Sequence, residues 1–212
     1  MSDPWSWDVA DHQERWDGYL IEPGSSVLRN KVGARTVEDL RNAENDLVEY
    51  RLAELRERPE LVARTYDADH VRALHRQLFQ DVYEWAGEFR TVGLAKGEGE
   101  DTSFIPPLEI GMPIAHVAQR ITDSDRLRRT AEEDLVGEVT YLYDYLNFAH
   151  PFREGNGRTQ REFFVALLAE TGRTMSWERV TMDELHRACH DARTAGDTSL
   201  LEQVMSLVLS DG

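Results

Sequence analysis

The sequence predicts an all-α domain, and two observations lead to that prediction. Apolar residues recur three and four positions apart through most of the 212 residues, which is the period of an α-helix. Proline, glycine and capping residues interrupt these patterns at spacings typical of helix ends. A chain of this length buries a substantial core, and no repeat or second-domain linker divides it. We therefore expect seven or eight helices in one bundle.

Residues 1–35 are rich in aromatic side chains but have only weak periodicity. A turn signal at residues 23–26, Pro-Gly-Ser-Ser, interrupts any long element there. We expect this segment to form a strap that packs on a domain comprising residues 36–212. The aromatic residues that would anchor the strap are Trp5, Trp7, Trp16 and Tyr19.

Two helices are predicted in the first half of the domain. Thr36 and Asp39 resemble a capping box, and Pro59 ends the helix that begins there. A second helix is predicted over residues 67–86, with Gly87 as its natural stop. Two histidines of this helix are interpreted as packing or surface residues, namely His70 and His75.

The pattern changes between residues 88 and 107. A short extended segment is predicted at residues 89–94, followed by a polar, glycine-containing loop at residues 96–103 and an apolar run at residues 104–107. This arrangement is typical of a hairpin or flap, although a solvated connection would give the same pattern. Loops held between rigid elements often carry binding residues.

Five further helices are predicted in the second half. The first lies around residues 114–121. Thr130 and Glu133 form a capping box for the second. That helix must end near Ala149, because Pro151 excludes the residue before it from the helical region. The last three are expected from about Asn156 to Gly172, from Thr181 to about Ala192, and from Asp197 or Thr198 to about Val208.

Acidic residues outnumber basic residues 40 to 24, which gives a formal net charge of −16. Evenly spread negative charge repels phosphate backbones, so no nucleic-acid-binding surface is expected. The single cysteine, Cys189, excludes an internal disulfide and indicates a reducing compartment. The N-terminus lacks signal-peptide features, and no apolar run approaches the roughly 20 residues of a membrane span. We expect a cytoplasmic protein without a membrane segment.

Residues 150–161, His-Pro-Phe-Arg-Glu-Gly-Asn-Gly-Arg-Thr-Gln-Arg, concentrate the chemically active side chains of the chain. Gly155 and Gly157 permit backbone angles and a close approach that side chains would forbid. Asn156 is a good N-cap for the helix that follows. The free amides in the first turn of that helix would form an anion site.

Arg158 and Arg161 lie three positions apart, so they would share one helix face and could both bind phosphate oxygens. The carboxylate of Glu154 would repel such a ligand unless a cation lay between them, and Mg²⁺ suits that position. Neutral His150 could act as a base for a hydroxyl. These groups favour phosphoryl or nucleotidyl transfer. The structural alternative is a turn before a helix, with a packed histidine.

The same run resembles the signature of the Fic family, His-x-Phe-x-(Asp/Glu)-Gly-Asn-Gly-Arg-x-x-Arg, and every defining position matches. Residues 82–87 and 103–106 also resemble the segments that precede and end the flap of that family. The likeness covers about residues 36–209. It implies a Fic-type helical bundle with a short β-hairpin flap beside the active-site loop.

The resemblance implies a protein adenylyltransferase, which moves AMP from ATP to a Tyr, Thr or Ser hydroxyl of a target protein and releases pyrophosphate. His150 would deprotonate the hydroxyl, and Glu154 would bind the nucleotide through Mg²⁺. The flap would hold the target segment as an added strand. The other residues implied in nucleotide binding are Gly155, Asn156, Gly157, Arg158 and Arg161. The flap residues implied in target docking are Lys96, Ser103 and Phe104.

Many members of the Fic family are silenced by a helix with the pattern Ser/Thr-x-x-x-Glu-Gly/Asn, whose glutamate pairs with the second motif arginine. Residues 40–45 contain Glu44-Asn45 but begin with leucine, and residues 198–203 contain Glu202 but end in glutamine. We therefore expect no inhibitory helix in this chain. Either a separate small antitoxin-like protein supplies the glutamate to Arg161, in which case this chain would be the toxin of that pair, or no inhibitor exists.

Two alternatives stay open from the sequence. A relative could use another nucleotide or a different phosphate-containing donor with the same base and anion site. A non-catalytic nucleotide-binding interaction module could also keep the fold. The presence of both His150 and Glu154 favours the enzyme, because loss of either would have been expected in such a module.

Overall fold

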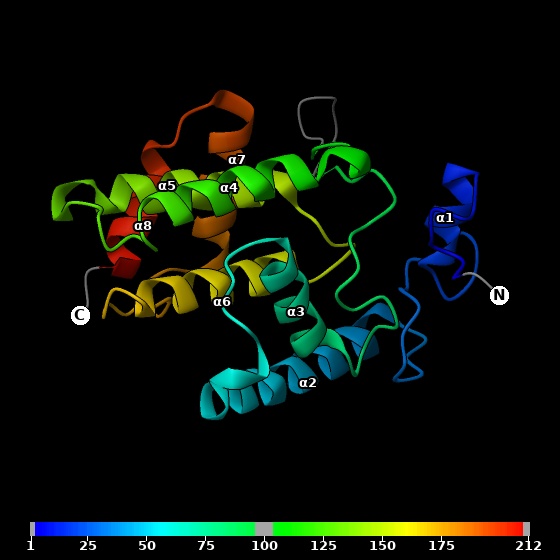
Figure 1. Cartoon of the computed structure of the whole chain (residues 1–212). Coiled ribbons are helices and arrows are strands. Elements are labelled where there is room, and N and C mark those ends of the chain that lie inside the picture. The colour runs from blue at the N-terminus through cyan, green and yellow to red at the C-terminus, as the bar shows by residue number, and fades with distance from the viewer. Residues whose placement is uncertain (1–2, 96–103, 210–212) are drawn as a thin grey trace.

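The computed structural model describes residues 3–95 and 104–209, and this part of the chain is a helical bundle, as predicted (Figure 1). Its element bounds are α1 His12–Gly18, α2 Val37–Glu57, η1 Pro59–Leu61, α3 Ala68–Phe79, η3 Pro107–Glu109, α4 Gly111–Asp123, α5 Glu132–Ala149, α6 Asn156–Ala169, α7 Met182–Ala195 and α8 Ser199–Leu209. No helix in the described ranges has the length and apolarity needed to cross a bilayer.

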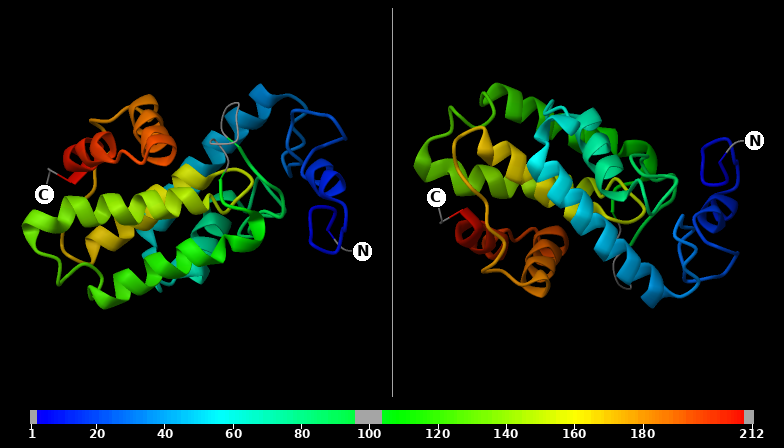
Figure 2. Two further views of the ribbon diagram at one scale, coloured as in Figure 1. Left: turned by 90° about the horizontal axis from the view of Figure 1, so that it is seen from above. Right: turned by 90° about the horizontal axis from the view of Figure 1, so that it is seen from below.

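Helix α5 lies at the centre of the bundle. It packs against α4 and α6, and its other side contacts α7 and α8. Helix α3 connects α2 to the rest of the bundle, because it contacts α2 as well as α4 and α6. In the views of Figure 2, α7 and α8 lie together near the C-terminus, while α1 lies at the opposite end with the N-terminal segment. The loop between α5 and α6 contacts both α3, through His75 and the Glu154 carbonyl, and the N-terminal segment, where the Arg153 guanidinium lies 4.6 Å from the Trp16 ring centroid.

The N-terminal segment contributes to a second hydrophobic cluster, separate from the main core. Trp5 and Tyr19 are buried there, and their ring centroids are 6.1 Å apart. Tyr19 packs edge-on against Trp85 at 5.7 Å. The Trp5 indole N–H also donates to Glu88 at 3.1 Å. These contacts tie the segment to the chain just before the predicted flap.

The predicted helix over residues 67–86 is too long, since α3 ends at Phe79. Its N-cap is Asp67, as the predicted start requires. The carbonyl of Gln80 accepts from the Lys31 side chain at 2.7 Å, and the carbonyl of Val82 accepts from the Lys31 amide at 2.8 Å. Both carbonyls therefore have partners in the N-terminal segment at the point where a further helical turn was predicted.

The capping box predicted at Thr130 and Glu133 is also wrong. Helix α5 begins at Glu132 with Ala131 as its N-cap, and no side chain caps it. The Thr130 amide instead donates to the carbonyl of Leu127 at 3.2 Å and belongs to the preceding turn. The box predicted at Thr181 is present, because its side chain and that of Glu184 cap each other's backbone amides.

The described ends of the flap lie beside each other. The Phe104 amide donates to the carbonyl of Leu94 at 3.0 Å. The predicted docking residues Lys96 and Ser103 lie outside the described residues, so the hairpin between these ends stays a prediction.

Candidate active site

A pocket of about 930 Å³ opens over the start of α6. Five of the predicted site residues line it together, while His150 and Asn156 do not: Glu154, Gly155, Gly157, Arg158 and Arg161. Its opposite wall comes from the first half of α2 and from residues 26 and 28 of the N-terminal segment, and α7 contributes residues 182 and 186. The pocket thus collects the predicted anion-binding groups on one side.

The loop that carries these groups begins and ends with left-handed backbone. His150 is the C-cap of α5, with φ 37° and ψ 60°, and Gly155 precedes α6 with φ 84°. Helix α5 therefore ends where Pro151 requires it to end. A Cβ atom on Gly155 would overlap the aromatic ring of Phe79, so this position excludes every side chain for two independent reasons.

Asn156 does not cap α6, contrary to the prediction. Gly155 occupies the N-cap position, and Asn156 is the first helical residue. Its amide nitrogen donates to the carbonyl of Phe152, and its amide oxygen accepts from the Phe152 N–H, both at 2.8 Å. Asn156 is buried, and its two bonds to Phe152 connect the start of α6 to the middle of the loop. The α6 amides are consequently not occupied by an asparagine side chain.

His75 supports the loop from α3. Its Nδ1 accepts from the Gly87 N–H at 2.8 Å, so Nε2 carries the proton and donates to the carbonyl of Glu154 at 2.9 Å. The ring stacks on Phe152 with centroids 3.7 Å apart. Burial lowers the pKa of His75 to about 3, which keeps the imidazole neutral. This packing histidine therefore holds the backbone that presents the Glu154 carboxylate.

Arg158 extends toward α2. Its guanidinium pairs with the carboxylate of Glu44, reaches Asn45 Oδ1 at 3.5 Å, and lies 4.8 Å from the ring centroid of Phe79. A second carboxylate, Glu154, lies 3.6 Å away. Arg158 is thus held by groups from three different elements.

Arg161 has different surroundings. Among residues 3–95 and 104–209, no carboxylate lies within ion-pair distance of its guanidinium. Burial lowers its pKa, an effect that nearby Tyr143 opposes. Neither glutamate of the partial inhibitory patterns reaches it. Glu44 pairs with Arg158, and Glu202 on α8 accepts from Thr198 at 3.4 Å.

His150 is held by aromatic stacking. Its ring lies parallel to that of Phe104, with centroids 3.7 Å apart, and the guanidinium of Arg193 lies 4.7 Å from the Phe104 ring centroid. Arg90 binds the backbone of the same residue through Nε, at 2.8 Å from the carbonyl oxygen. The structure places His150 at the junction of α5, the described end of the flap and α7.

A model of the Fic/DOC family matches residues 65–168, the stretch from α3 to α6 that builds this loop. A probable protein adenylyltransferase Fic of Salmonella typhimurium is 31% identical over 195 residues, covering 92% of this chain and 93% of that protein. The chain belongs to the Fic/DOC family.

Other relatives agree with this membership. The protein adenylyltransferase VbhT of Bartonella schoenbuchensis is 33% identical over 167 residues, which are 79% of this chain and 34% of that protein. The Fic/DOC fold is also seen in the crystal structure of BepC from Bartonella tribocorum with bound AMPPNP. That structure superposes with a TM-score of 0.82 at 22% identity and covers 91% of this chain and 96% of the other.

Four residues around this Fic/DOC loop escaped the sequence analysis as site residues. They are Glu44, His75, Tyr83 and Arg90, and all are buried. His75 and Arg90 bond to the backbone of the loop, Glu44 pairs with Arg158, and Tyr83 donates to Glu44. These partners lie far apart in the chain, so no local spacing marks them. Glu44 was marked only by the incomplete inhibitory pattern of residues 40–45. For the other three the sequence signal is polarity at positions where the helical or turn pattern calls for a buried residue.

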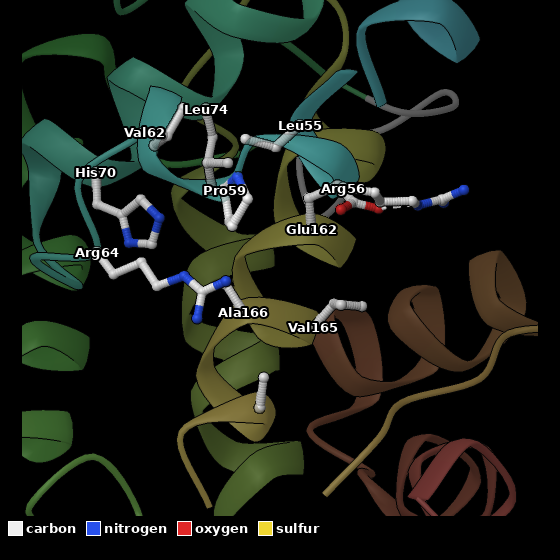
Figure 3. A pocket seen from close by; sticks show the side chains of 11 residues that line it. Leu55, Arg56, Pro59, Val62, Arg64, His70, Leu74, Glu162, Val165 and Ala166 are labelled. Atoms are coloured by element: carbon white, nitrogen blue, oxygen red, sulfur yellow. Dashed lines mark ion pairs between the residues drawn. The ribbon is translucent and has the colours of Figure 1, made fainter. Parts of the chain in front are cut away.

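A second cavity, of about 190 Å³, lies between the end of α2, η1, α3 and α6 (Figure 3). Its lining is mostly apolar, and it includes none of residues 150–161. Arg56 and Glu162 point toward each other at one end, with Nη2 and Oε1 4.0 Å apart. His70 lines the opposite end, where burial lowers its pKa to about 4. We interpret this cavity as a gap in the packing between these helices and not as part of the site.

Proposed function

We propose that this chain is a protein adenylyltransferase, which transfers AMP from ATP to a Tyr, Thr or Ser hydroxyl of a target protein. The observation that carries the proposal is the pocket in which Glu154, Arg158 and Arg161 surround the uncapped start of α6. Amides at a helix start and paired arginines suit a polyphosphate, because both place positive charge on its oxygens. The names of the relatives, protein adenylyltransferases, support AMP as the group transferred.

The proposed reaction is a single in-line displacement. The target hydroxyl oxygen would form a bond to the α-phosphorus while the bond from that phosphorus to the bridging oxygen breaks, so that pyrophosphate leaves. The hydroxyl proton would pass to His150. The amides of Gly155, Asn156 and Gly157 and the two arginines would stabilise the charge that develops on the phosphate oxygens.

Mg²⁺ fits the residues of this pocket. The Glu154 side chain is 46% exposed and lines the pocket, and its Oε1 accepts from the Gly155 amide at 2.8 Å. One carboxylate beside a polyphosphate is a usual protein share of a Mg²⁺ site. When bound, the ion would neutralise phosphate charge, and Glu154 would be the residue that holds it.

We further propose that regulation comes from outside this chain. The absence of a carboxylate on Arg161 within the described residues supports a separate small antitoxin-like protein that would place a glutamate there. The chain would then be the toxin of a cytoplasmic pair. Phe104, with Lys96 and Ser103, would dock the target segment along the flap.

Labelling in a cell lysate tests the proposed activity. The protein is incubated with Mg²⁺ and α-labelled ATP, and in parallel with α-labelled GTP, UTP and CTP. We expect a protein band labelled from ATP that is lost in His150→Ala. His190→Ala is the matched control, because this histidine is exposed on α7. If another nucleotide labels the band instead of ATP, the transferred group is that nucleotide monophosphate and not AMP. If no nucleotide labels any protein once the partner protein is removed, the proposed transferase activity is wrong.

A pull-down tests the proposed partner. The chain is used as bait for small proteins from the same cell, beside an Arg161→Glu variant. We expect a small partner to bind the first and be released by the second, since two carboxylates would then repel each other. Activation of the isolated chain by Glu202→Gly would instead place the inhibitor within it.

A further inference from the structure

Glu44 is a buried carboxylate on α2 that faces the proposed nucleotide pocket. Glu44 is 6% exposed and lines that pocket beside Asn45. Oε1 accepts from the Arg158 guanidinium, and Oε2 accepts from the Tyr83 hydroxyl. Burial, reinforced by Glu44, raises the pKa of Tyr83, so the phenol stays protonated and keeps donating. Both oxygens of the carboxylate therefore have partners.

The surroundings of Glu44 hold it in place. Leu40 and Val48 are buried one turn before and after it, which anchors this part of α2. Tyr83 is itself buried and stacks on Trp85 with centroids 4.2 Å apart. A carboxylate fixed by helix packing and by a buried phenol cannot swing out of the pocket as an exposed side chain can. Glu44 is thus a permanent part of the wall.

Arg158 lies between this fixed carboxylate and a freer one. The Glu154 side chain is 46% exposed, against 8% for that of Glu44, and lies 3.6 Å from the Arg158 guanidinium. The better-buried pair is the stronger one, since a low local dielectric strengthens Coulomb attraction. The guanidinium is held on the Glu44 side and makes only a longer contact with Glu154.

We propose that Glu44 is a positioning residue that retains Arg158 and so leaves the Glu154 carboxylate available to a divalent cation. The inference rests on the proposed function of the pocket as a Mg²⁺–nucleotide site. Without the Glu44 charge, Arg158 turns onto Glu154 and forms a full ion pair. That pair competes with Mg²⁺ for the same oxygens.

The prediction concerns Mg²⁺ dependence rather than activity alone. Binding of α,β-methylene-ATP is measured by calorimetry over a series of Mg²⁺ concentrations. In Glu44→Gln we expect the Mg²⁺ concentration for half-maximal binding to rise about fivefold, the upper end for an exposed competing ion pair. Because Arg158 is also a proposed phosphate ligand, the double variant Glu44→Gln/Arg158→Gln is compared with Arg158→Gln alone. Once the competitor is absent, loss of Glu44 should change the Mg²⁺ requirement by no more than about twofold between these two variants.

Two controls separate this effect from loss of structure. Glu54→Gln lies on the same helix, where Glu54 pairs with Arg51 and Gln77, and it should leave the Mg²⁺ requirement unchanged. Tyr83→Phe removes the other partner of Glu44 but leaves the Arg158 pair, so its Mg²⁺ requirement should stay near that of the wild type. Glu44→Asp keeps the proposal testable if Glu44→Gln unfolds, because it keeps the charge but shortens the side chain that reaches Arg158. An unchanged Mg²⁺ requirement in Glu44→Asp would contradict the positioning role.

The outcomes distinguish this inference from the proposed transfer. An unchanged Mg²⁺ requirement in Glu44→Gln overturns the positioning role, even if the wild type labels proteins. Tighter nucleotide binding without Mg²⁺ in that variant also overturns it, since Glu44 would then act by repelling the ligand. A requirement that Glu44→Gln raises in the wild-type background, but not in the Arg158→Gln background, supports the inference even if no protein is labelled.

Discussion

The Nε atom of Arg90 donates a hydrogen bond of 2.8 Å to the carbonyl oxygen of His150. The same guanidinium binds three more carbonyls, those of Val92 at 2.8 Å, Ile105 at 2.7 Å and Ala149 at 3.4 Å. Arg90 is 1% exposed, and burial lowers its pKa to about 10, so it is still charged at neutral pH. One buried cation thus joins both described ends of the flap to the end of α5.

Replacing Arg90 with alanine should destabilise the protein by about 3 kcal/mol or more, because several buried carbonyls would lose their donor. Lysine would keep the charge but cannot reach all four carbonyls, so we expect an intermediate loss of stability. Urea unfolding measures both. Arg72→Lys is the control, since Arg72 binds a single carbonyl, that of Gly87, and should cost less than about 1 kcal/mol. Wild-type stability in Arg90→Ala would show that the bonds from Arg90 to these carbonyls do not stabilise the fold.

Phe104 should affect transfer more than stability. Its ring stacks on His150 and would hold the imidazole toward the substrate hydroxyl. Loss of that orientation typically costs tenfold or more in rate. We expect Phe104→Leu to lower the transfer rate by about that factor and Phe104→Tyr to retain it. Phe148→Leu, at a 39% exposed position of α5, should have little effect. Equal rates in the leucine and tyrosine variants would contradict a role for the ring.

Gly155 should tolerate no other residue. Alanine there meets the Phe79 ring and requires an unfavourable positive φ. We expect Gly155→Ala to cost about 2–4 kcal/mol, the sum of backbone strain and overpacking. Gly137→Ala on α5 is the matched control, because a Cβ there meets nothing within 4 Å and alanine favours helix by up to about 1 kcal/mol. Thermal unfolding should move in opposite directions for the two variants.

Acid should destabilise the protein through its buried histidines. Burial lowers the pKa of His70 to about 4 and that of His75 to about 3, below the unfolded value near 6.5. The unfolded chain therefore binds more protons below pH 6.5, and the stability from each neutral histidine declines as pH falls toward its folded pKa. Each histidine removes up to about 1.4 kcal/mol per pH unit in this window.

The contribution of one histidine can be isolated by substitution. His70→Gln keeps an acceptor for the Tyr66 amide, which donates to His70 Nδ1 at 3.3 Å, but does not titrate. The free energy of unfolding of this variant should fall less steeply between pH 6.5 and 4.5 than that of the wild type. Parallel curves would show that His70 is not the acid-sensitive group.

Much of the fold follows from local patterns. Thr36, Thr181 and Pro151 are local signals, and the helix boundaries they predicted agree with α2, α7 and the end of α5. Two of the boundaries that failed involve local bonds, from the Thr130 amide to Leu127 and between Asn156 and Phe152, and the third involves a distant partner. Lys31 bonds to the carbonyl of Gln80 just after the end of α3, and sequence spacing does not show where a lysine 49 positions away will lie.

The sequence by itself determined which chemical groups the loop of residues 150–161 presents, because these groups are neighbours in the chain. Only the tertiary structure decided which partners those groups have. Glu44 meets Arg158 across 114 positions, and His75 meets Glu154 across 79. Such contacts depend on how α2 and α3 pack against α6, and packing depends on the shape of the whole core rather than on any local period.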